Sequence, residues 1–458
     1  MTSSDITRFE IDGFSGRLFH PDHADYDTHR KVYNGMIDRR PAVIARCATA
    51  DDVVRVVKLA QARDLPLSVY GGGHAVTGTA VCDAGICLDL RGMKRIDIDP
   101  AAKTARVEAG ANWGEFDAAT HAHGLAMTGG RNPTTGVAGL TVGSGSGWLE
   151  RKFGFVCDNL TKAEVVTADG RKVIASETEN PDLFWGLRGG GGNFGIVTAF
   201  HFRLHDLPPA ILGGVLIYPA PMAAAVLKNF RDFMQTAPDE VSGAVVFTTA
   251  PHAPFVPAPA RGQPVALVQI VYAGDPEEGA RIVAPLRAFG PPAADALAVL
   301  PYPVLQTQGG NFPGSQNYWT ADFLAELPDD AIDAFAKLAL APIAPECAII
   351  MVAGGGAPSR VPEEARAFGT RTAPWNVHYI CGWADPADNA RNIERVKAAA
   401  AVLKPWATGR VYLNYIGDEG QARIESSFGA EKLARLRALK GKWDPHNFFR
   451  HNQNIRPA

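Results

Sequence analysis

A histidine that closes a run of three glycines is the residue of this sequence best suited to form a covalent bond. The segment reads Val69-Tyr70-Gly71-Gly72-Gly73-His74 and directly follows a predicted strand. Because glycine lacks a Cβ, the backbone N–H groups of this loop can approach and surround a bulky anion such as a pyrophosphate. Imidazole is a nucleophile, which phosphate binding alone does not require. The alternative is a histidine that only caps a turn.

Two further glycine segments follow, at 134–147 and 188–197, and the second opens directly into a predicted strand. Small residues at this density build no core, but they let backbone amides and hydroxyls line an extended ligand. A Rossmann site for NAD needs its glycines between the first strand and its helix, with an acidic residue about 20 positions later. Here the first glycines follow the second predicted strand, and no helix pattern follows them. The three segments together point to a flavin, with His74 able to bond to it.

The sequence Tyr412-Leu413-Asn414-Tyr415 is a candidate for proton transfer. On a predicted strand, Tyr412 and Asn414 would point to the same side. A buried phenol that is hydrogen-bonded to an amide can accept a proton when a neighbour stabilises its phenolate. We therefore expect Tyr412 to be the base, assisted by Tyr415. The alternative is an aromatic strand that only packs. We expect the polar tail 442–455 to close over a ligand. The alternative is a solvated tail without ligand contact.

Metal chemistry finds little support in the spacing of histidines and cysteines. His20 and His23 form a close pair, but no carboxylate or cysteine set accompanies them. Cys82 and Cys87 lack the second cysteine pair that an iron–sulfur site needs. We expect no metal, and reduced, mostly buried thiols.

These motifs need a framework that mixes helices and strands. A strand at 42–45, a helix that begins at a capping box on Thr49, and a strand at 65–70 form a predicted βαβ unit. From about residue 208, predicted helices (223–234, 330–339, 389–402) alternate with strands (265–272, 347–352, 375–380). This pattern predicts a second α+β domain, a sheet with helices on one face. We expect domains at 1–207 and 208–415, and a segment 416–458 that returns to the first domain.

Composition limits the classes of function. The chain has 458 residues, 46% hydrophobic and 20% charged, which is typical of a globular protein with two or three domains. A formal net charge of −3 gives no basic surface for nucleic acid. The segment 1–13 does not resemble a secretory signal, and no apolar run is long enough to span a membrane. We expect a cytoplasmic protein that acts on a small molecule without a membrane partner.

With these motifs, the chain resembles the berberine-bridge-enzyme-like flavoprotein oxidases of the vanillyl-alcohol-oxidase superfamily, most closely at 40–205 and 410–456. The resemblance implies an α+β fold. A PCMH-type FAD-binding domain of two subdomains would be joined to a substrate domain of antiparallel sheet backed by helices. The family histidine bonded to the flavin 8α-methyl group falls on His74. The family Y-x-N element falls on Tyr412 and Asn414.

The sequence departs from the family at one bonding position. Many members carry a second flavin link through the cysteine of a G-x-C-P-T-x-G element. Here the element reads Gly130-Arg131-Asn132-Pro133-Thr134-Thr135-Gly136, so Asn132 stands at the cysteine position. We therefore expect FAD to be linked through His74 alone, with no cysteinyl link, and Cys157 to be a buried thiol.

The resemblance implies oxidation of a C–H next to an alcohol or amine by hydride transfer to flavin N5, with O2 reduced to H2O2. Alternatives are a dehydrogenase with another acceptor, a flavin-oxygen-adduct tailoring enzyme and a flavin-loaded binding protein. An aromatic or cyclic substrate would lie between the domains against Tyr318, Trp319, Trp375, His378 and Tyr379, unless these are core residues. The positions expected to contact FAD are His74, Tyr70, Gly71, Gly72, Gly73, Gly78, Gly130, Thr134, Thr135, Gly136, Gly139, Gly143, Ser144, Gly145, Asn159, Gly195, Ile196, Val197 and Asn452.

Overall fold

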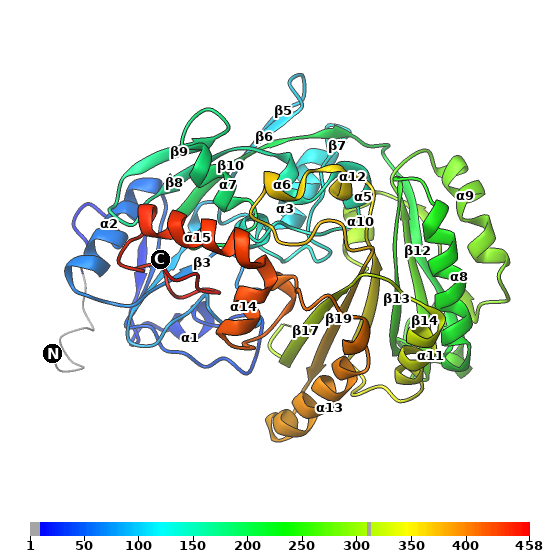
Figure 1. Cartoon of the computed structure of the whole chain (residues 1–458). Coiled ribbons are helices and arrows are strands. Elements are labelled where there is room, and N and C mark those ends of the chain that lie inside the picture. The colour runs from blue at the N-terminus through cyan, green and yellow to red at the C-terminus, as the bar shows by residue number, and fades with distance from the viewer. Residues whose placement is uncertain (1–9, 309–312) are drawn as a thin grey trace.

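The computed structural model describes residues 10–308 and 313–458, which form two layered halves (Figure 1). Residues 1–9, part of the segment expected to lack a secretory signal, lie outside the described residues. In the described part of the chain, no helix has the length and apolar character needed to cross a membrane.

The first half begins with a four-stranded sheet of order β1-β2-β4-β3. Its strands are β1 (Arg17–Phe19), β2 (Val43–Arg46), β4 (Ile86–Asp89) and β3 (Leu67–Tyr70). Helix α2 (Ala50–Ala62) connects β2 to β3, and the capping box predicted at Thr49 is present, with Asp52 as its partner. Strands β2 and β3 both pair in parallel with β4, which lies between them. The glycine loop therefore leaves the edge strand of this sheet.

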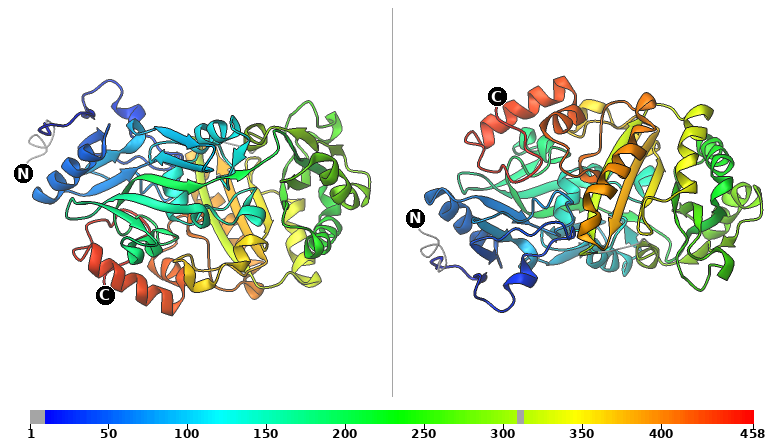
Figure 2. Two further views of the ribbon diagram at one scale, coloured as in Figure 1. Left: turned by 90° about the horizontal axis from the view of Figure 1, so that it is seen from above. Right: turned by 90° about the horizontal axis from the view of Figure 1, so that it is seen from below.

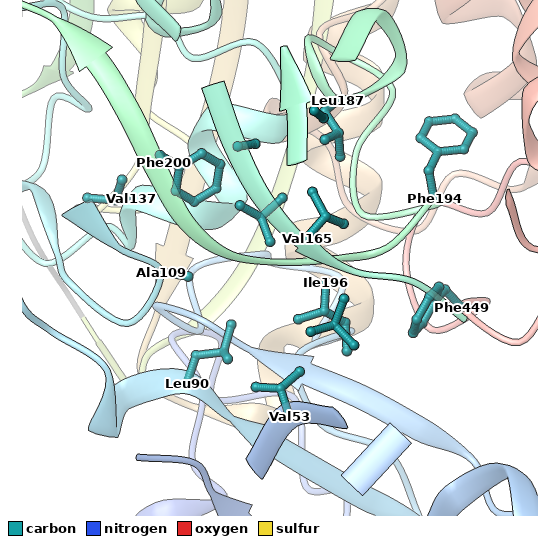
Figure 3. Close-up of a cluster of buried hydrophobic side chains, with 14 of the residues drawn as sticks. Val53, Leu90, Ala109, Val137, Val165, Leu187, Phe194, Ile196, Phe200 and Phe449 are labelled. Atoms are coloured by element: carbon teal, nitrogen blue, oxygen red, sulfur yellow. The ribbon is translucent and has the colours of Figure 1, made fainter. Parts of the chain in front are cut away.

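A five-stranded antiparallel sheet of order β5-β6-β10-β8-β9 lies beside the first sheet. Its strands are β5 (Ile96–Asp99), β6 (Thr104–Glu108), β10 (Ile196–Arg203), β8 (Leu160–Val166) and β9 (Lys172–Ser176). The two sheets share one hydrophobic core, in which Val53 of α2 and Val165 of β8 belong to the same cluster (Figure 3).

The second half is an eight-stranded antiparallel sheet of order β15-β12-β14-β13-β18-β19-β17, with β16 also paired to β12. Helices α8 (Ala223–Thr236), α9 (Pro276–Ala288), α11 (Asp329–Ala336) and α13 (Asn389–Ala401) cover its outer face, and its inner face is turned toward the first half (Figure 1). The strands are β12 (Ile211–Pro219), β13 (Val241–Thr249), β14 (Pro264–Tyr272), β15 (Ala294–Asp295), β16 (Ala298–Leu300), β17 (Gln316–Leu324), β18 (Ala348–Ala353) and β19 (Trp375–Trp383). The antiparallel sheet backed by helices that the resemblance implied is thus confirmed.

Shorter elements complete the chain. The helices are α1 (Tyr26–His29), α3 (Trp113–His121), α4 (Val137–Val142), α5 (Glu150–Phe153), α6 (Val156–Asn159), α7 (Pro181–Leu187), α10 (Tyr302–Gln306), α12 (Ala357–Arg360), α14 (Gln421–Phe428) and α15 (Ala430–Trp443). Strand β7 (Leu125–Ala126) pairs with β11 (His205–Asp206). The 3-10 turns are η1 (Leu90–Gly92), η2 (Ala220–Met222), η3 (Ala258–Ala260), η4 (Lys337–Leu340), η5 (Glu363–Ala365), η6 (Pro386–Asp388), η7 (Lys404–Trp406) and η8 (Leu413–Tyr415).

The C-terminal segment packs against the first half (Figure 2). Leu439 and Trp443 of α15, with Phe449 and Ile455 beyond it, are buried in the core of the two N-terminal sheets. The amide of Ile455 donates a hydrogen bond of 2.9 Å to Asn193 Oδ1. On these contacts we propose the boundaries 1–207, 208–415 and 416–458 as the domain division.

Candidate functional site

A cavity of about 1020 Å³ lies between the two halves. Its walls are the three glycine segments, the tail after α15 and the inner face of the eight-stranded sheet. The predicted cofactor positions that line it are Gly71, Gly72, Gly73, His74, Gly130, Thr135, Gly136, Gly139, Gly143, Gly195, Ile196, Val197 and Asn452. A separate cavity beside Tyr412, of about 40 Å³, is too small for a cofactor.

Two of the glycine segments pack backbone against backbone. A Cβ on Gly72 would lie 2.2 Å from the amide nitrogen of Gly136, and a Cβ on Gly136 would lie 2.4 Å from the amide nitrogen of Gly72. Both positions therefore exclude any side chain. At Gly139 and Gly192 a Cβ would meet nothing within 4 Å. Since these two also line the cavity, the space beside them is open to a ligand.

His74 is held at the cavity wall by hydrogen bonding and ring stacking. Its Nε2 lies 2.8 Å from Thr134 Oγ1, and the Thr134 hydroxyl donates a hydrogen bond of 2.8 Å to Asn132 Oδ1. The imidazole stacks on Tyr33, with ring centroids 4.6 Å apart. Burial lowers the pKa of His74 to about 4, so the ring is neutral at physiological pH and keeps a nucleophilic lone pair.

The two positions considered for a cysteinyl link differ in access to the cavity. Asn132 lines the cavity and carries an amide, which is no nucleophile. Cys157 does not line it, and burial raises the pKa of its thiol to about 12. A protonated, enclosed thiol is unreactive. All six cysteines of the chain are buried and unpaired.

A phenol, a guanidinium and an imidazole meet on another part of the cavity wall. Arg131 Nη1 donates a hydrogen bond of 2.7 Å to the hydroxyl of Tyr415. The Tyr415 ring stacks on His378, with centroids 3.9 Å apart and planes 3° apart. Burial and the Arg131 charge lower the pKa of His378, so this imidazole is neutral. Trp319 continues the aromatic wall, 5.4 Å from His378 and 5.6 Å from Tyr33 between ring centroids.

The structure corrects the predicted strand at Tyr412. The segment after Tyr412 is the 3-10 turn η8 and not a strand, although Asn414 Nδ2 does donate a hydrogen bond of 3.0 Å to the Tyr412 hydroxyl. That hydroxyl also accepts hydrogen bonds from the amides of Gly145 and Ser146, at 2.9 and 3.2 Å. Tyr412 does not line the large cavity, and burial raises the pKa of its phenol. Tyr412 therefore anchors the glycine segment, whereas Asn414 and Tyr415 face the cavity.

Other predicted cofactor positions do not line the cavity either. The Tyr70 hydroxyl donates a hydrogen bond of 2.7 Å to the carbonyl of Lys31, and the Arg91 guanidinium lies 3.8 Å from the Tyr70 ring centroid. Asn159 is buried and accepts a hydrogen bond of 2.7 Å at Oδ1 from His205. These side chains therefore make their polar and ring contacts within the protein itself. The positions outside the cavity lining are Tyr70, Gly78, Thr134, Ser144, Gly145 and Asn159.

Strand alternation divides the predicted substrate residues between two faces of the sheet. Trp319 of β17 and His378 of β19 line the cavity. Trp375 and Tyr379 occupy the opposite face of β19, in the core beneath the helices, and Tyr318 packs against the same core. Neighbouring residues on a strand point to opposite faces. Tyr318, Trp375 and Tyr379 are therefore core residues, as the alternative interpretation held.

Sequence reasoning missed the partners of the aromatic wall. Arg131 lies in the variable position of the motif that carries Asn132, and Tyr33 follows no recognisable motif. Neither position gives a sequence signal that it meets Tyr415 or His74. In the described residues, no group of three or more His, Cys, Asp or Glu side chains is arranged to hold a metal ion.

The cavity fits a long dinucleotide. Its volume is sufficient, Gly72 and Gly136 bring two loops into direct contact, and Gly139 and Gly192 leave backbone open to a ligand. Gly143 fits closely against Asn414, because a Cβ there would lie 2.2 Å from Asn414 Oδ1. FAD suits this cradle, with the neutral imidazole of His74 at the wall.

Comparisons with known families agree with this geometry. A family model described as FAD binding domain matches residues 41–176, and one described as Berberine and berberine like matches residues 411–456. (R)-6-hydroxynicotine oxidase of Paenarthrobacter nicotinovorans is 31% identical, covering 96% of this chain and 97% of that protein. An FAD-linked oxidoreductase of Dictyostelium discoideum is 28% identical, covering 97% of this chain and 96% of its own length.

Solved structures show the same architecture. The crystal structure of 6-hydroxy-D-nicotine oxidase from Arthrobacter nicotinovorans has a TM-score of 0.86 and 29% identity, covering 97% of this chain and 99% of that chain. The BBE-like 1 protein of Physcomitrella patens has a TM-score of 0.87 and 24% identity, covering 100% of this chain and 99% of that chain. At 24% identity, the similarity to the Physcomitrella patens protein shows a shared fold only.

Proposed function

Since this chain belongs to the berberine-bridge-enzyme-like family of FAD-linked oxidoreductases, we propose that it is an oxidase that oxidises a carbon bearing an alcohol or amine and reduces dioxygen to hydrogen peroxide. Bound FAD would supply the electron acceptor for the C–H oxidation and the route of those electrons to dioxygen. The observation that carries the proposal is the pairing of Tyr415 with Arg131 on the wall of the cavity that His74 also lines.

Tyr415 is proposed as the base of the reaction. Its hydroxyl is the phenol of the Tyr412–Tyr415 segment that faces the cavity, so it can take the proton of a substrate O–H or N–H group. The Arg131 guanidinium, 2.7 Å from that hydroxyl, stabilises the negative charge that develops there. The stacked ring of His378 holds the phenol in its orientation.

His74 is proposed as the single covalent attachment point of FAD. The Thr134 hydroxyl uses its one proton toward Asn132, so the contact between His74 and Thr134 requires the imidazole proton on Nε2. The lone pair for a bond to the flavin 8α-methyl group is then on Nδ1. Asn132 supplies no second link, because its amide is no nucleophile.

The attachment is tested by acid precipitation of the purified protein. The expected result is a yellow pellet, with a flavin-bearing peptide that contains His74. His74→Ala should give a colourless pellet with FAD in the supernatant. FAD released intact from the wild type would contradict the proposed link.

The activity is tested by screening alcohols and amines for hydrogen peroxide release. With a turned-over substrate, Tyr415→Phe should lower kcat by roughly 10²- to 10⁴-fold. Tyr412→Phe should lower kcat less than Tyr415→Phe does, since its hydroxyl lies outside the cavity lining and acts only by anchoring the glycine segment. Substrate reduction of the flavin without reoxidation by dioxygen would indicate a dehydrogenase with another acceptor. Unchanged turnover in Tyr415→Phe would refute the assigned base.

A further inference from the structure

The cavity extends along the inner face of the eight-stranded sheet, and this part of its wall is mostly aliphatic. Ile217 of β12, Val246 of β13 and Leu267 of β14 lie side by side in the strand register, and Ile350 of β18 continues the row. Such a wall favours an apolar ligand body. It offers few hydrogen bonds to a sugar or another polyhydroxylated substrate.

One carboxylate interrupts this apolar wall. Of the described residues that line the cavity, Glu346 alone carries a carboxylate. Its Oε2 atom is buried without a hydrogen-bond partner. A buried carboxylate oxygen that lacks a partner is costly. A cationic group of a ligand would relieve that cost by forming a charge-assisted hydrogen bond.

Oxygen acceptors converge on a point just above Gly382. A Cβ built on Gly382 would have three nearest heavy atoms, all oxygens: Asn317 Oδ1 at 3.5 Å, Glu346 Oε2 at 3.6 Å and the carbonyl oxygen of Gln316 at 3.7 Å. Gly382, Glu346 and Asn317 all line the cavity. A position surrounded by acceptors, one of them anionic, suits an ammonium group, which has only donors.

This acceptor group lies away from the aromatic end of the cavity. Gly382 and His378 are four residues apart on the same face of β19, which corresponds to about 13 Å along the strand. His378 stacks on Tyr415, and between His378 and Gly382 the cavity wall is formed by Ile380 of β19 and its partner Trp319 of β17. Trp319 Nε1 donates a hydrogen bond of 3.2 Å to Asn317 Oδ1, and an amide oxygen can accept a second one.

We propose that Glu346, Asn317 and the Gln316 carbonyl bind the ammonium group of the substrate, which is an elongated apolar amine oxidised at the end remote from that group. The proposal rests on the proposed oxidase function for the oxidised end only. Recognition of the ammonium group is a binding property and is measurable without turnover.

The test compares three ligands of equal length by calorimetric titration of the holoenzyme: 7-phenylheptylamine, 7-phenylheptan-1-ol and 7-phenylheptanoate. The wild type should bind the amine roughly 10- to 100-fold more tightly than the alcohol, and the carboxylate least. Glu346→Gln should remove most of this preference. Glu326→Gln, the same change at an exposed position, should leave it intact.

A second variant keeps the test independent of the charge change. Gly382→Ala would place a methyl group at the acceptor point in ordinary van der Waals contact, so the sheet should tolerate it. The variant should bind the amine more weakly than the wild type does and should bind the alcohol with unchanged affinity. Equal affinities for amine and alcohol in the wild type, or an unchanged preference in Glu346→Gln, would overturn the proposal. Displacement of the amine by potassium chloride but not by choline chloride would also overturn it, because the oxygens would then be an inorganic cation site.

The outcome separates the two proposals. A charge preference that Glu346→Gln abolishes, in a protein that releases no peroxide with any tested amine or alcohol, would keep the ammonium site and contradict the oxidase. Release of peroxide by a wild type that binds amines and alcohols equally would support the oxidase and contradict the ammonium site.

Discussion

Replacing Lys440 by Met should release the C-terminal wall of the cavity. Lys440 and Asp444 are fully buried, and Lys440 Nζ donates to Asp444 Oδ2 at 2.6 Å, to the Asn193 carbonyl at 2.7 Å and to the Phe449 carbonyl at 2.9 Å. Asp444 in turn accepts from the amide of Phe449 at 2.8 Å. Removing the cation leaves a buried carboxylate unpaired, which costs about 3–5 kcal/mol.

Amide hydrogen exchange of peptides that cover 444–455 measures this cost locally, since a protein of this size need not unfold in one step. At about 1.4 kcal/mol per factor of ten, exchange should accelerate by roughly two to four orders of magnitude. Lys442→Met is the matched control on the same helix. Lys442 is 61% exposed and pairs with Asp182 at the surface, so its loss should cost no more than about 1 kcal/mol.

Exchange in Lys440→Met within threefold of the Lys442→Met control would refute the reasoning. Should Lys440→Met fail to fold, the double variant Lys440→Met/Asp444→Asn restores a neutral pair. Recovery of protection in the double variant would still support the role of the unpaired charge.

Three further predictions concern buried positions. Burial raises the pKa of Asp117 to about 7, against about 3.9 in an unfolded chain. Between these values the folded state keeps a proton that the unfolded state loses. The free energy of unfolding therefore falls as pH rises from about 4 to 7. Asp117→Asn should remove this pH dependence of stability, which amounts to up to about 4 kcal/mol. Thermal melts at a series of pH values measure it, and parallel curves of Tm against pH for the wild type and the variant would contradict the prediction. Gly72→Ala should abolish flavin retention, because its Cβ would lie 2.2 Å from the Gly136 amide nitrogen. Gly441→Ala should retain flavin, because a Cβ there meets nothing within 4 Å and lies outside the cavity lining. Equal retention in the two variants would disprove the importance of the backbone contact. Cys157→Ser should leave the flavin–peptide bond unchanged by mass spectrometry, and loss of that bond would show that this thiol is a second attachment point.

The local chemistry of the fold was readable from the sequence. Thr49 and Asp52 form the capping box that their types and spacing predict, and residues of all three glycine segments line the cavity. Glycine and capping residues act through contacts a few residues away, so their effect does not depend on distant packing.

The orientation of strand residues in the second half was not readable. Trp375 and His378 are both compatible with a pocket, yet only the tertiary packing decides which face of β19 meets the helices. The same holds for Tyr412 and Tyr415, since a 3-10 turn replaced the expected strand. Glu346 gave no signal either, because its significance depends on its position next to Gly382 of strand β19.

The tail from Phe449 to Gln453 contributes to the same wall as the glycine loop at His74. During synthesis, this segment leaves the ribosome after every strand of the described sheets, so FAD can be enclosed only once translation has passed it. Closure of the cavity around FAD is therefore a late step of biogenesis.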